Sequence, residues 1–305
     1  MADLMTFKVG EASPANTFFA IWMARAAGFY QANGLNLEII SVVGGKESGP
    51  DLTKGRIDLM HIGMSSVVRA NGAGADLRTI GSLSNVIRNT MFTAPKVKSA
   101  ADLKGGTVGI SSAGSESEPT TILALRKLGL KREDVTLKEI GVQRLDAVHN
   151  GEVSATVLGE PYRTQAFALG LNPIVDLFAD KVPWLYSGLV VAKSFLETRR
   201  EDAKRFLKAT VEGNYLAVRD EAYAKKILAK ELKLTDSKTI DSSYANFKSQ
   251  TPLNAETTRP GAKNIIDIVA TGAMSRNVDD YIDDSLHDDL RAEGFFDAMA
   301  KKYKP

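Results

Sequence analysis

One pattern occurs twice in this sequence and restricts the folds that the chain can adopt. Residues 8–13 (Lys-Val-Gly-Glu-Ala-Ser) and 107–112 (Thr-Val-Gly-Ile-Ser-Ser) share a Val-Gly-x-x-Ser core. Three glycines spaced by ten and then eight residues follow each core: Gly45, Gly55 and Gly63 in the first copy, and Gly141, Gly151 and Gly159 in the second. A repeat of about a hundred residues is too long for a solenoid and suits two lobes. We therefore predict two similar α/β units.

The second copy opens a stretch that has the composition of an anion-binding loop. A short buried strand is followed by a loop of small residues at 111–117 and by a helix at 120–130. Pro119 fits the first helical turn, and Ser115 or Ser117 can cap the helix. Backbone N–H groups at the positive end of a helix dipole suit an oxyanion. An ordinary capped turn between a strand and a helix would have the same composition.

The composition indicates a globular protein and excludes several classes of function. The chain has 305 residues, and its 39 Lys and Arg residues nearly balance its 37 Asp and Glu residues, so we expect no nucleic-acid partner. Cysteine is absent, which excludes disulfides, thiol nucleophiles and thiolate metal sites. The sequence contains no uninterrupted run of eighteen apolar residues, so we predict no membrane span. The first residues do not resemble a signal peptide, so a secreted protein after signal removal and a cytoplasmic protein both fit.

Strands alternate with helices in the order that is typical of a doubly wound parallel sheet. In the first unit the apolar pattern indicates strands at 6–10, 35–43 and 57–64 and a helix at 16–30. In the second unit it indicates strands at 108–110, 135–140 and 155–158 and a helix at 144–150. Extended segments at 77–94 and 186–192 read as connections. We predict an α/β fold with two doubly wound lobes, a ligand cleft between them and two hinge crossings. Lobe 1 comprises residues 1–90 and 191–305, and lobe 2 is inserted at 91–190.

Four short blocks in this order resemble the substrate-binding proteins of ABC transporters. They are Ala-Gly-Phe-Tyr-Gln-Ala-Asn-Gly-Leu-Asn-Leu-Glu at 27–38, Lys-Gly-Arg-Ile-Asp at 54–58, Ala-Asp-Leu-Lys-Gly-Gly-Thr-Val-Gly at 101–109 and Gly-Glu-Pro-Tyr at 159–162. The resemblance covers nearly the whole chain and is to the branch for sulfonates, taurine, nitrate-like anions and thiamine-pyrimidine precursors. It implies a type II periplasmic-binding-protein fold and a monomer in the periplasm. Hinge motion would close the lobes on a ligand, which is then delivered to a membrane permease and its ATPase.

The resemblance also implies which positions line the cleft, and ligands of doubly wound sheets bind outside the carboxyl ends of the strands. Lobe 1 would contribute Ser13, Pro14, Asn16, Gly44, Gly45, Ser65 and Ser66, and lobe 2 would contribute Ser112, Gly114, Ser115 and Glu160. Phe18 reads as a core residue close to the cleft. Trp184 and Tyr186, beside the second crossing, could stack on a ligand or pack at the hinge. Arg88 could bind a carboxylate or sulfonate in bidentate fashion, as could Arg163.

Several polar residues have an ordinary structural interpretation that we favour at this point. Glu116 and Glu118 would complement the helix dipole from the solvent side, although they could instead favour a ligand that carries an amine. His61 would be packed in the core, and His149 and His287 would be exposed. The acidic run at 283–289 lacks the spacing of a calcium loop, so no metal site is expected.

These observations favour a binding protein over an enzyme or a sensor. No serine–histidine–aspartate order or phosphate-binding lysine loop stands out, so we expect neither catalytic residues nor a cofactor. The enzymes on this scaffold that the resemblance brings in, such as a thiamine-pyrimidine synthase type, depend on cysteines that this chain does not contain. A sensory domain would use the same lobes. The expected ligand is a small organic molecule with one oxyanion end, such as a carboxylate or a sulfonate, and a flat or apolar body.

Overall fold

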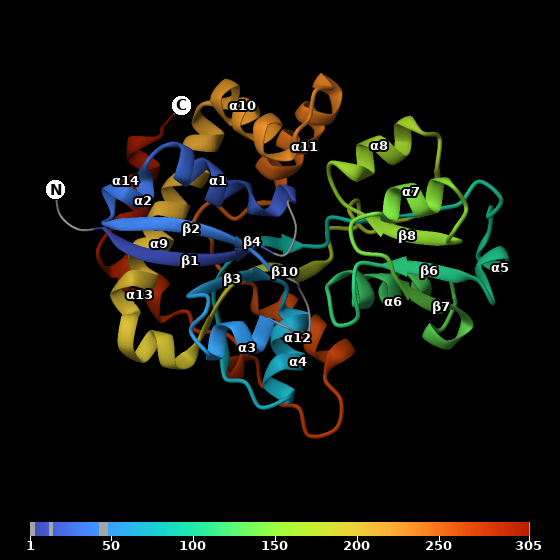
Figure 1. Ribbon diagram of the computed structural model, residues 1–305, viewed down its shortest axis with the longest axis horizontal. Coiled ribbons are helices and arrows are strands. Elements are labelled where there is room, and N and C mark those ends of the chain that lie inside the picture. Colours follow the sequence, from blue (N-terminus) through green and yellow to red (C-terminus); the bar gives the residue numbers. More distant parts are fainter. Residues whose placement is uncertain (1–3, 12–14, 43–47, 305) are drawn as a thin grey trace.

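A computed structural model describes residues 4–11, 15–42 and 48–304, and its strands form two mixed five-stranded sheets (Figure 1). The first sheet has the strand order β2-β1-β3-β10-β4. Its strands are β1 (Met5–Glu11), β2 (Leu35–Ser41), β3 (Leu59–Ile62), β4 (Leu77–Val86) and β10 (Pro183–Ala192). Strand β1 pairs in parallel with β2 and β3, whereas β10 runs antiparallel to β3 and β4.

The second sheet repeats this arrangement with the strand order β7-β6-β8-β5-β9. Its strands are β5 (Thr90–Thr93), β6 (Thr107–Ile110), β7 (Thr136–Glu139), β8 (Ala155–Leu158) and β9 (Asn172–Asp176). Strand β6 pairs in parallel with β7 and β8, and β5 runs antiparallel to β8 and β9. The two sheets therefore share one topology, which confirms the two similar α/β units that the glycine repeat predicts.

The sheets are mixed, so the expectation of purely parallel sheets is wrong. The reason lies in the connections between them. Strand β5 enters the second sheet and runs antiparallel to its neighbour β8. Strand β10 returns to the first sheet and runs antiparallel to its neighbour β3. We call the first sheet with the helices on it lobe 1, and the second sheet with its helices lobe 2. The bounds 1–90 with 191–305 and 91–190 stay a prediction; the bound after residue 190 falls within β10.

Helices cover both faces of the two sheets (Figure 1). Lobe 1 carries η1 (Asn16–Phe18), α1 (Phe19–Ala26), α2 (Phe29–Ala32), α3 (Ser48–Thr53), α4 (Met64–Gly72), α9 (Lys193–Arg219), α10 (Glu221–Leu232), α11 (Ser237–Gln250), α12 (Arg259–Val269), η4 (Val278–Asp280), α13 (Ser285–Ala292) and α14 (Phe295–Lys302). Lobe 2 carries α5 (Ala100–Leu103), α6 (Ser117–Lys127), η3 (Arg132–Asp134), α7 (Arg144–His149) and α8 (Tyr162–Ala168). No helix in the described part of the chain has the length and apolar character that crossing a bilayer requires.

Two of the predicted helices have different bounds for identifiable reasons. The predicted helix at 16–30 consists of η1, α1 and α2, and the break between α1 and α2 arises because Gly28 adopts a φ of +73°. This left-handed conformation ends a helix and is accessible to glycine at little cost. The helix predicted to start at residue 120 already starts at Ser117, so that Glu116 becomes its N-cap residue. This shift decides the environment of Glu116.

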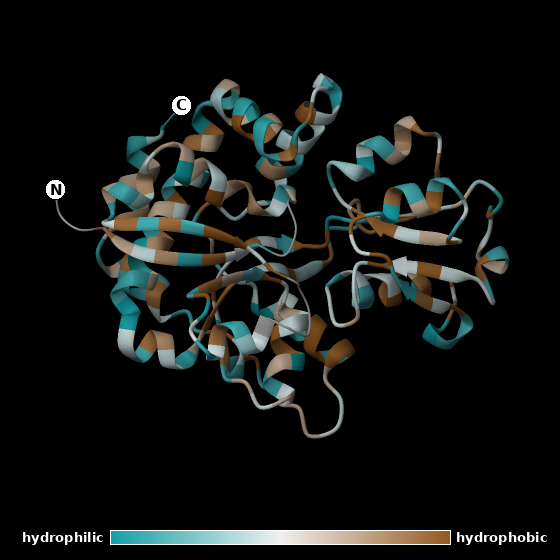
Figure 2. Cartoon of the chain, in the orientation of Figure 1, coloured by the Kyte–Doolittle hydropathy of each residue, from teal (hydrophilic) through white to brown (hydrophobic). Residues whose placement is uncertain are grey.

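The hydrophobic core of lobe 1 is built from aromatic stacking between the sheet and its helices. Phe206 of α9 stacks on Phe7 of β1 with ring centroids 5.0 Å apart and on Tyr30 of α2 at 5.2 Å. A second cluster continues through Ile87 and Trp184, at the two crossings, into the core of lobe 2. Figure 2 shows the alternation of hydrophobic and hydrophilic residues along the helices that such one-sided burial requires. The crossings are therefore packed structure and not loose linkers.

Candidate functional site

A pocket of about 520 Å³ lies between the lobes, where the parallel strands of both sheets end. This size is within the range of small-molecule sites. Its walls come from the end of β3, the start of α4, the loop before α6, the start of α7 and strand β10. The lining residues are Ala15, Thr17, Val42, His61, Ile62, Gly63, Ser66, Ser111, Ser112, Ser115, Glu116, Ser117, Gly141, Val142, Arg144, Tyr186 and Ser187.

Glu116 connects the two lobes at one wall of this pocket. Its Oε1 accepts a hydrogen bond from the backbone N–H of Ser65 at 2.6 Å, and its Oε2 accepts one from Trp184 Nε1 at 2.7 Å. The residue is only 8% exposed, so the expectation that it faces solvent is wrong. Burial raises the pKa of the carboxyl to about 7, although both donors act to lower it.

The same wall contains further contacts between α4 of lobe 1 and the loop of lobe 2. Ser66 Oγ donates to the carbonyl of Gly114 at 3.2 Å. Glu118 accepts from the backbone N–H of Gly114 at 2.8 Å and from Arg69 Nη2 at 3.2 Å. Glu118 therefore pairs with a cation of the opposite lobe and is not simply a solvated dipole partner.

The serines of the loop before α6 bond mainly to one another. Ser111 Oγ lies 2.8 Å from Ser115 Oγ and 2.9 Å from Ser117 Oγ. Ser117 Oγ also accepts the backbone N–H of Ser111 at 2.8 Å, and Ser115 Oγ donates to the carbonyl of Ser112 at 2.7 Å. A hydroxyl can donate once and accept twice, so this cluster keeps acceptor and donor capacity that it can redirect to a ligand.

Arg144, at the start of α7, brings a guanidinium to the pocket. Its Nε donates to the carbonyl of Gly141 at 3.2 Å and its Nη1 to that of Val157 at 3.1 Å. Burial lowers its pKa, and the nearby Tyr186 partly offsets this, but an arginine stays protonated at neutral pH. Within residues 4–11, 15–42 and 48–304, no carboxylate forms an ion pair with Arg144. Arg144 was not among the site residues predicted from the sequence, although it follows Gly141, which aligns with Gly45 of the first repeat.

His61 also reaches the pocket from β3, where the sequence suggested a core residue. Its Nε2 contacts the hydroxyl of Ser187, and its ring packs edge-on against Phe18 with centroids 5.1 Å apart. Burial lowers the pKa of His61 to about 4, so the imidazole is neutral at pH 7. The side chain is half-buried, and its ring hydrogen-bonds the hydroxyl of Ser187 and the backbone of Thr17.

The other predicted site residues fall into three groups. Ser66, Ser112, Ser115 and Tyr186 line the pocket. Ser13, Pro14, Gly44 and Gly45 lie outside the described residues. The remaining predicted residues do not line the pocket and are buried in the structure around it: Asn16, Phe18, Ser65, Arg88, Gly114, Glu160 and Trp184.

Arg88 shows what such a buried residue does. It follows β4 at the first crossing, is buried, and donates to Ser84 Oγ at 2.6 Å, to Asn246 Oδ1 at 3.0 Å and to Thr251 Oγ1 at 2.9 Å. These bonds attach the crossing to α11. Asn16 joins the same network through a hydrogen bond to Asn246 Oδ1 at 3.2 Å.

Glu160 provides a second contact between the lobes, on the side opposite Glu116. Its Oε2 accepts the backbone N–H of Thr164 at 3.2 Å and its Oε1 the hydroxyl of Ser242 at 3.1 Å. Thr164 Oγ1 in turn donates to Ser242 Oγ at 2.8 Å. Arg163, the alternative arginine of the sequence analysis, pairs with Asp176 at 3.2 Å.

Of the two histidines predicted to be exposed, only His149 is so. His287 is buried because α13 packs into lobe 1, where the ring Nε2 lies 3.0 Å from the carbonyl of Asn254. Within the described ranges, no group of three His, Asp or Glu side chains is arranged to hold a metal ion.

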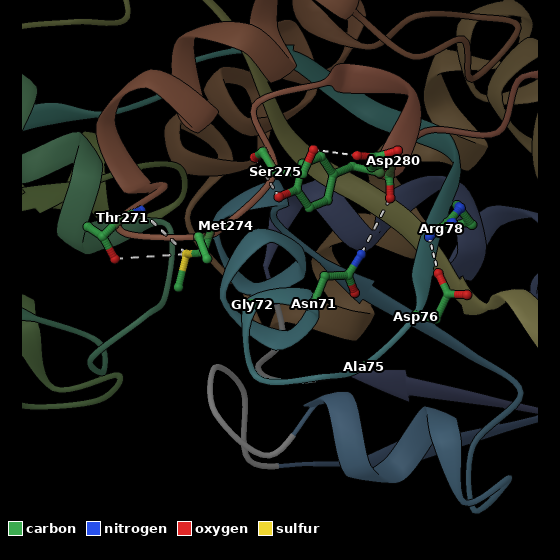
Figure 3. Close-up of a pocket in the computed structure, with 11 residues that line it drawn as sticks. Asn71, Gly72, Ala75, Asp76, Arg78, Thr271, Met274, Ser275 and Asp280 are labelled. Carbon is green, nitrogen blue, oxygen red and sulfur yellow. Dashed lines mark hydrogen bonds and ion pairs between the residues drawn. The ribbon is translucent and has the colours of Figure 1, made fainter.

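A second pocket, of about 410 Å³, opens at the surface of lobe 1 (Figure 3). Its polar side chains are bonded to neighbouring groups. Asn71 Nδ2 donates to the carbonyl of Leu77 at 3.1 Å, Arg78 pairs with Asp76, and Tyr281 donates to the carbonyl of Ser275 at 2.8 Å. With these groups engaged, the interlobe pocket is the better candidate for the functional site.

Two α/β lobes of the same topology, two crossings and a cleft pocket define a periplasmic-binding-protein fold, and similar solved structures share it. A protein from Bordetella bronchiseptica RB50 has a TM-score of 0.81 at 16% identity and covers 99% of each chain. The ligand-binding component of an ABC-type import system from Staphylococcus aureus has a TM-score of 0.75 at 17% identity and covers 93% of this chain and 98% of that one.

The sequence identifies the family within this fold. The sequence model of the NMT1/THI5-like family matches residues 15–223, so the chain belongs to that family. A curated relative is the riboflavin-binding protein RibY of Chloroflexus aurantiacus, which is 27% identical over 224 residues. The match covers 69% of this chain and 62% of the relative, so the chain spans about three fifths of that protein's length.

Proposed function

We propose that this protein is the solute-binding component of an ABC import system. It binds a small organic ligand in the interlobe pocket by hinge closure and delivers it, unchanged, to a membrane permease and its ATPase. Membership of the NMT1/THI5-like family supports this proposal, as do the names of the relatives from Staphylococcus aureus and Chloroflexus aurantiacus. A ligand that contacts both lobes binds the closed arrangement better and therefore shifts the population toward it.

The ligand that the pocket suits best has one oxyanion end and a flat or apolar body. The observation that carries this is Arg144, a guanidinium in the pocket wall to which the described residues offer no carboxylate. A carboxylate or sulfonate can pair with it in bidentate fashion and accept further bonds from the loop hydroxyls. Tyr186 offers a ring for the body, and Val42, Ile62 and Val142 offer apolar surface.

Binding is favoured over catalysis although a serine and a histidine meet in the pocket. The hydroxyl of Ser187 contacts His61, which is how a nucleophile and its base are arranged. However, a pKa of about 4 makes His61 a weak base at neutral pH. The ring also bonds to the backbone of Thr17, and among the described side chains no carboxylate orients it as in a catalytic triad.

A thermal-shift screen followed by calorimetry tests the proposal. We expect carboxylates and sulfonates with flat or apolar bodies to stabilise the protein, by about 2.7 kcal/mol at a hundred times Kd. Arg144→Lys keeps the charge but loses the planar fork, so affinity for these compounds should fall at least tenfold. Arg126→Lys, an exposed arginine on α6 of the same lobe, is the matched control and should bind as wild type.

The same experiment can reject the proposal in two ways. Stabilisation by amines alone, unaffected by Arg144→Lys, would exclude an oxyanion ligand. A time-dependent mass change in the ligand recovered after denaturation would indicate an enzyme.

A further inference from the structure

No side chain next to α4 in the sequence caps the N-terminus of this helix. Gly63 is the N-cap residue and has no side chain; its carbonyl accepts the N–H of Ser66 at 3.1 Å, but no local side chain caps the N–H of Ser65. The acceptor for Ser65 N–H comes instead from lobe 2, where Glu116 Oε1 lies 2.6 Å away. A carboxylate at this position interacts favourably with the helix dipole.

The surroundings are shaped to admit this carboxylate. A Cβ built on Gly63 would lie 1.9 Å from Glu116 Cγ, so only glycine leaves room for the side chain. Trp184 of β10 donates to the second carboxylate oxygen at 2.7 Å. Both oxygens of Glu116 therefore have a donor, one from α4 and one from β10 of lobe 1.

The N-terminus of a helix at the edge of a ligand pocket is where a ligand's own oxyanion would be expected to bind. Here Glu116 already fills that position, and Gly63, Ser66 and Glu116 all line the pocket. The guanidinium of Arg144 belongs to lobe 2. It donates to the carbonyls of Gly141 and Val157, but no carboxylate of the described residues pairs with it. The pocket thus has one anion position occupied by the protein and one that is open.

We propose that Glu116 is a specificity-determining residue, which supplies from lobe 2 the anion that the start of α4 would otherwise take from the ligand. The inference rests on the proposed function, since it concerns the same pocket. It follows that the pocket accepts a ligand with one oxyanion, at Arg144. A ligand with a second anionic group would have to place that group where the Glu116 carboxyl already accepts the N–H of Ser65. At a pH above about 7, where this carboxyl is ionised, repulsion between like charges also rejects such a ligand.

Inorganic sulfate is a suitable probe, because its use needs no knowledge of the natural ligand. The uniformly ¹⁵N-labelled protein is titrated with sulfate, and the Ser65 amide and the Trp184 indole report on the start of α4. Trp22 is the other of the two tryptophans, so Trp22→Phe assigns the indole signals. In Glu116→Ala we expect saturable shifts of both signals, with an apparent Kd at least tenfold lower than in wild type.

Glu118→Ala is the matched control. Glu118 is also a carboxylate of this loop, but it contacts Arg69 and Gly114 N–H, so its removal leaves the start of α4 occupied. The control should respond to sulfate as wild type does. Should Glu116→Ala not give the spectrum of a folded protein, Glu116→Ser serves in its place.

The proposal is overturned if wild type binds sulfate at the Ser65 amide as tightly as Glu116→Ala does, or if the variant does not respond. A response of Glu118→Ala equal to that of Glu116→Ala also overturns it. The Arg144 Nε–H signal is recorded in the same spectra. If the Arg144 signal does not shift with sulfate, the proposed oxyanion site at Arg144 is wrong, but the shift of the Ser65 amide still tests the role of Glu116. Failure of the proposed function and failure of this inference are therefore distinguishable.

Discussion

Glu116 links the stability of the protein to pH at the scale of a single residue. Burial raises the pKa of its carboxyl from the ordinary 4.5 to about 7. Between these values the folded protein holds a proton that the unfolded chain has released. The stabilisation that Glu116 contributes is therefore complete below pH 4.5 and is lost as the pH rises through 7. The pKa difference corresponds to at most about 3 kcal/mol.

We expect Glu116→Gln to remove this dependence, because an amide keeps an oxygen for Ser65 N–H but does not titrate. Urea unfolding between pH 4.5 and pH 8 measures it. Relative to the variant, wild type should lose up to about 3 kcal/mol of unfolding free energy across this range. Identical pH profiles for the two proteins would show that the carboxyl titrates as it does in water.

The sequence was enough to predict which residues line the pocket when those residues directly follow a strand. It was not enough when the environment of a residue depends on contacts with the opposite lobe. Ser112 and Ser115 belong to the loop after β6 and were found. Glu116 was assigned to solvent because its partners, Ser65 and Trp184, lie 51 and 68 residues away and no local pattern announces them. Arg144 was not predicted because the repeat is visible in its glycines, whereas the residues that follow Gly45 and Gly141 differ between the two copies.

At the scale of elements, the contact between α4 and the loop before α6 can be tested through Gly63. Its φ of −78° and ψ of 158° are open to alanine, and the three atoms nearest to an added Cβ all belong to Glu116. We expect a loss of about 1–3 kcal/mol in unfolding free energy from this overpacking. In a Glu116→Ala background the clash partner is gone, and Gly63→Ala should cost little.

A double-mutant cycle over wild type, Gly63→Ala, Glu116→Ala and the double variant isolates the interaction free energy between residues 63 and 116. A coupling free energy of at least about 1 kcal/mol is the expected result. Equal costs of Gly63→Ala in both backgrounds would mean that the two residues do not meet in solution.

The elements themselves were largely predictable, because the apolar spacing and the glycine repeat agree on their order. Their ends and directions were less so. The strand predicted at 186–192 begins three residues earlier at Pro183, and its antiparallel direction against β3 and β4 depends on the path of the chain between the lobes. Periodicity along one segment carries no information on that path.

At the scale of the whole molecule, α8 of lobe 2 lies against α11 of lobe 1, and the proposed hinge motion would have to separate them. Thr164 Oγ1 and Ser242 Oγ lie 2.8 Å apart across this contact. Because the chain contains no cysteine, a Thr164→Cys, Ser242→Cys double variant can form only this disulfide within one molecule. Oxidation should hold the lobes together and slow ligand association at least tenfold, measured by stopped-flow fluorescence.

Reduction with dithiothreitol should restore the rate, and each single cysteine variant should bind at the wild-type rate throughout. An oxidised double variant that binds as fast as its reduced form would show that the ligand enters without separation of these helices.

A crystal structure of the protein with the best compound from the screen tests the central claim most directly. We expect an unaltered ligand in the interlobe pocket, with its carboxylate or sulfonate within hydrogen-bonding distance of Arg144 and its body against Tyr186. Glu116 should remain on the N–H of Ser65. A ligand bound outside this pocket, a cationic group on Glu116 with Arg144 unoccupied, or a chemically changed ligand would contradict it.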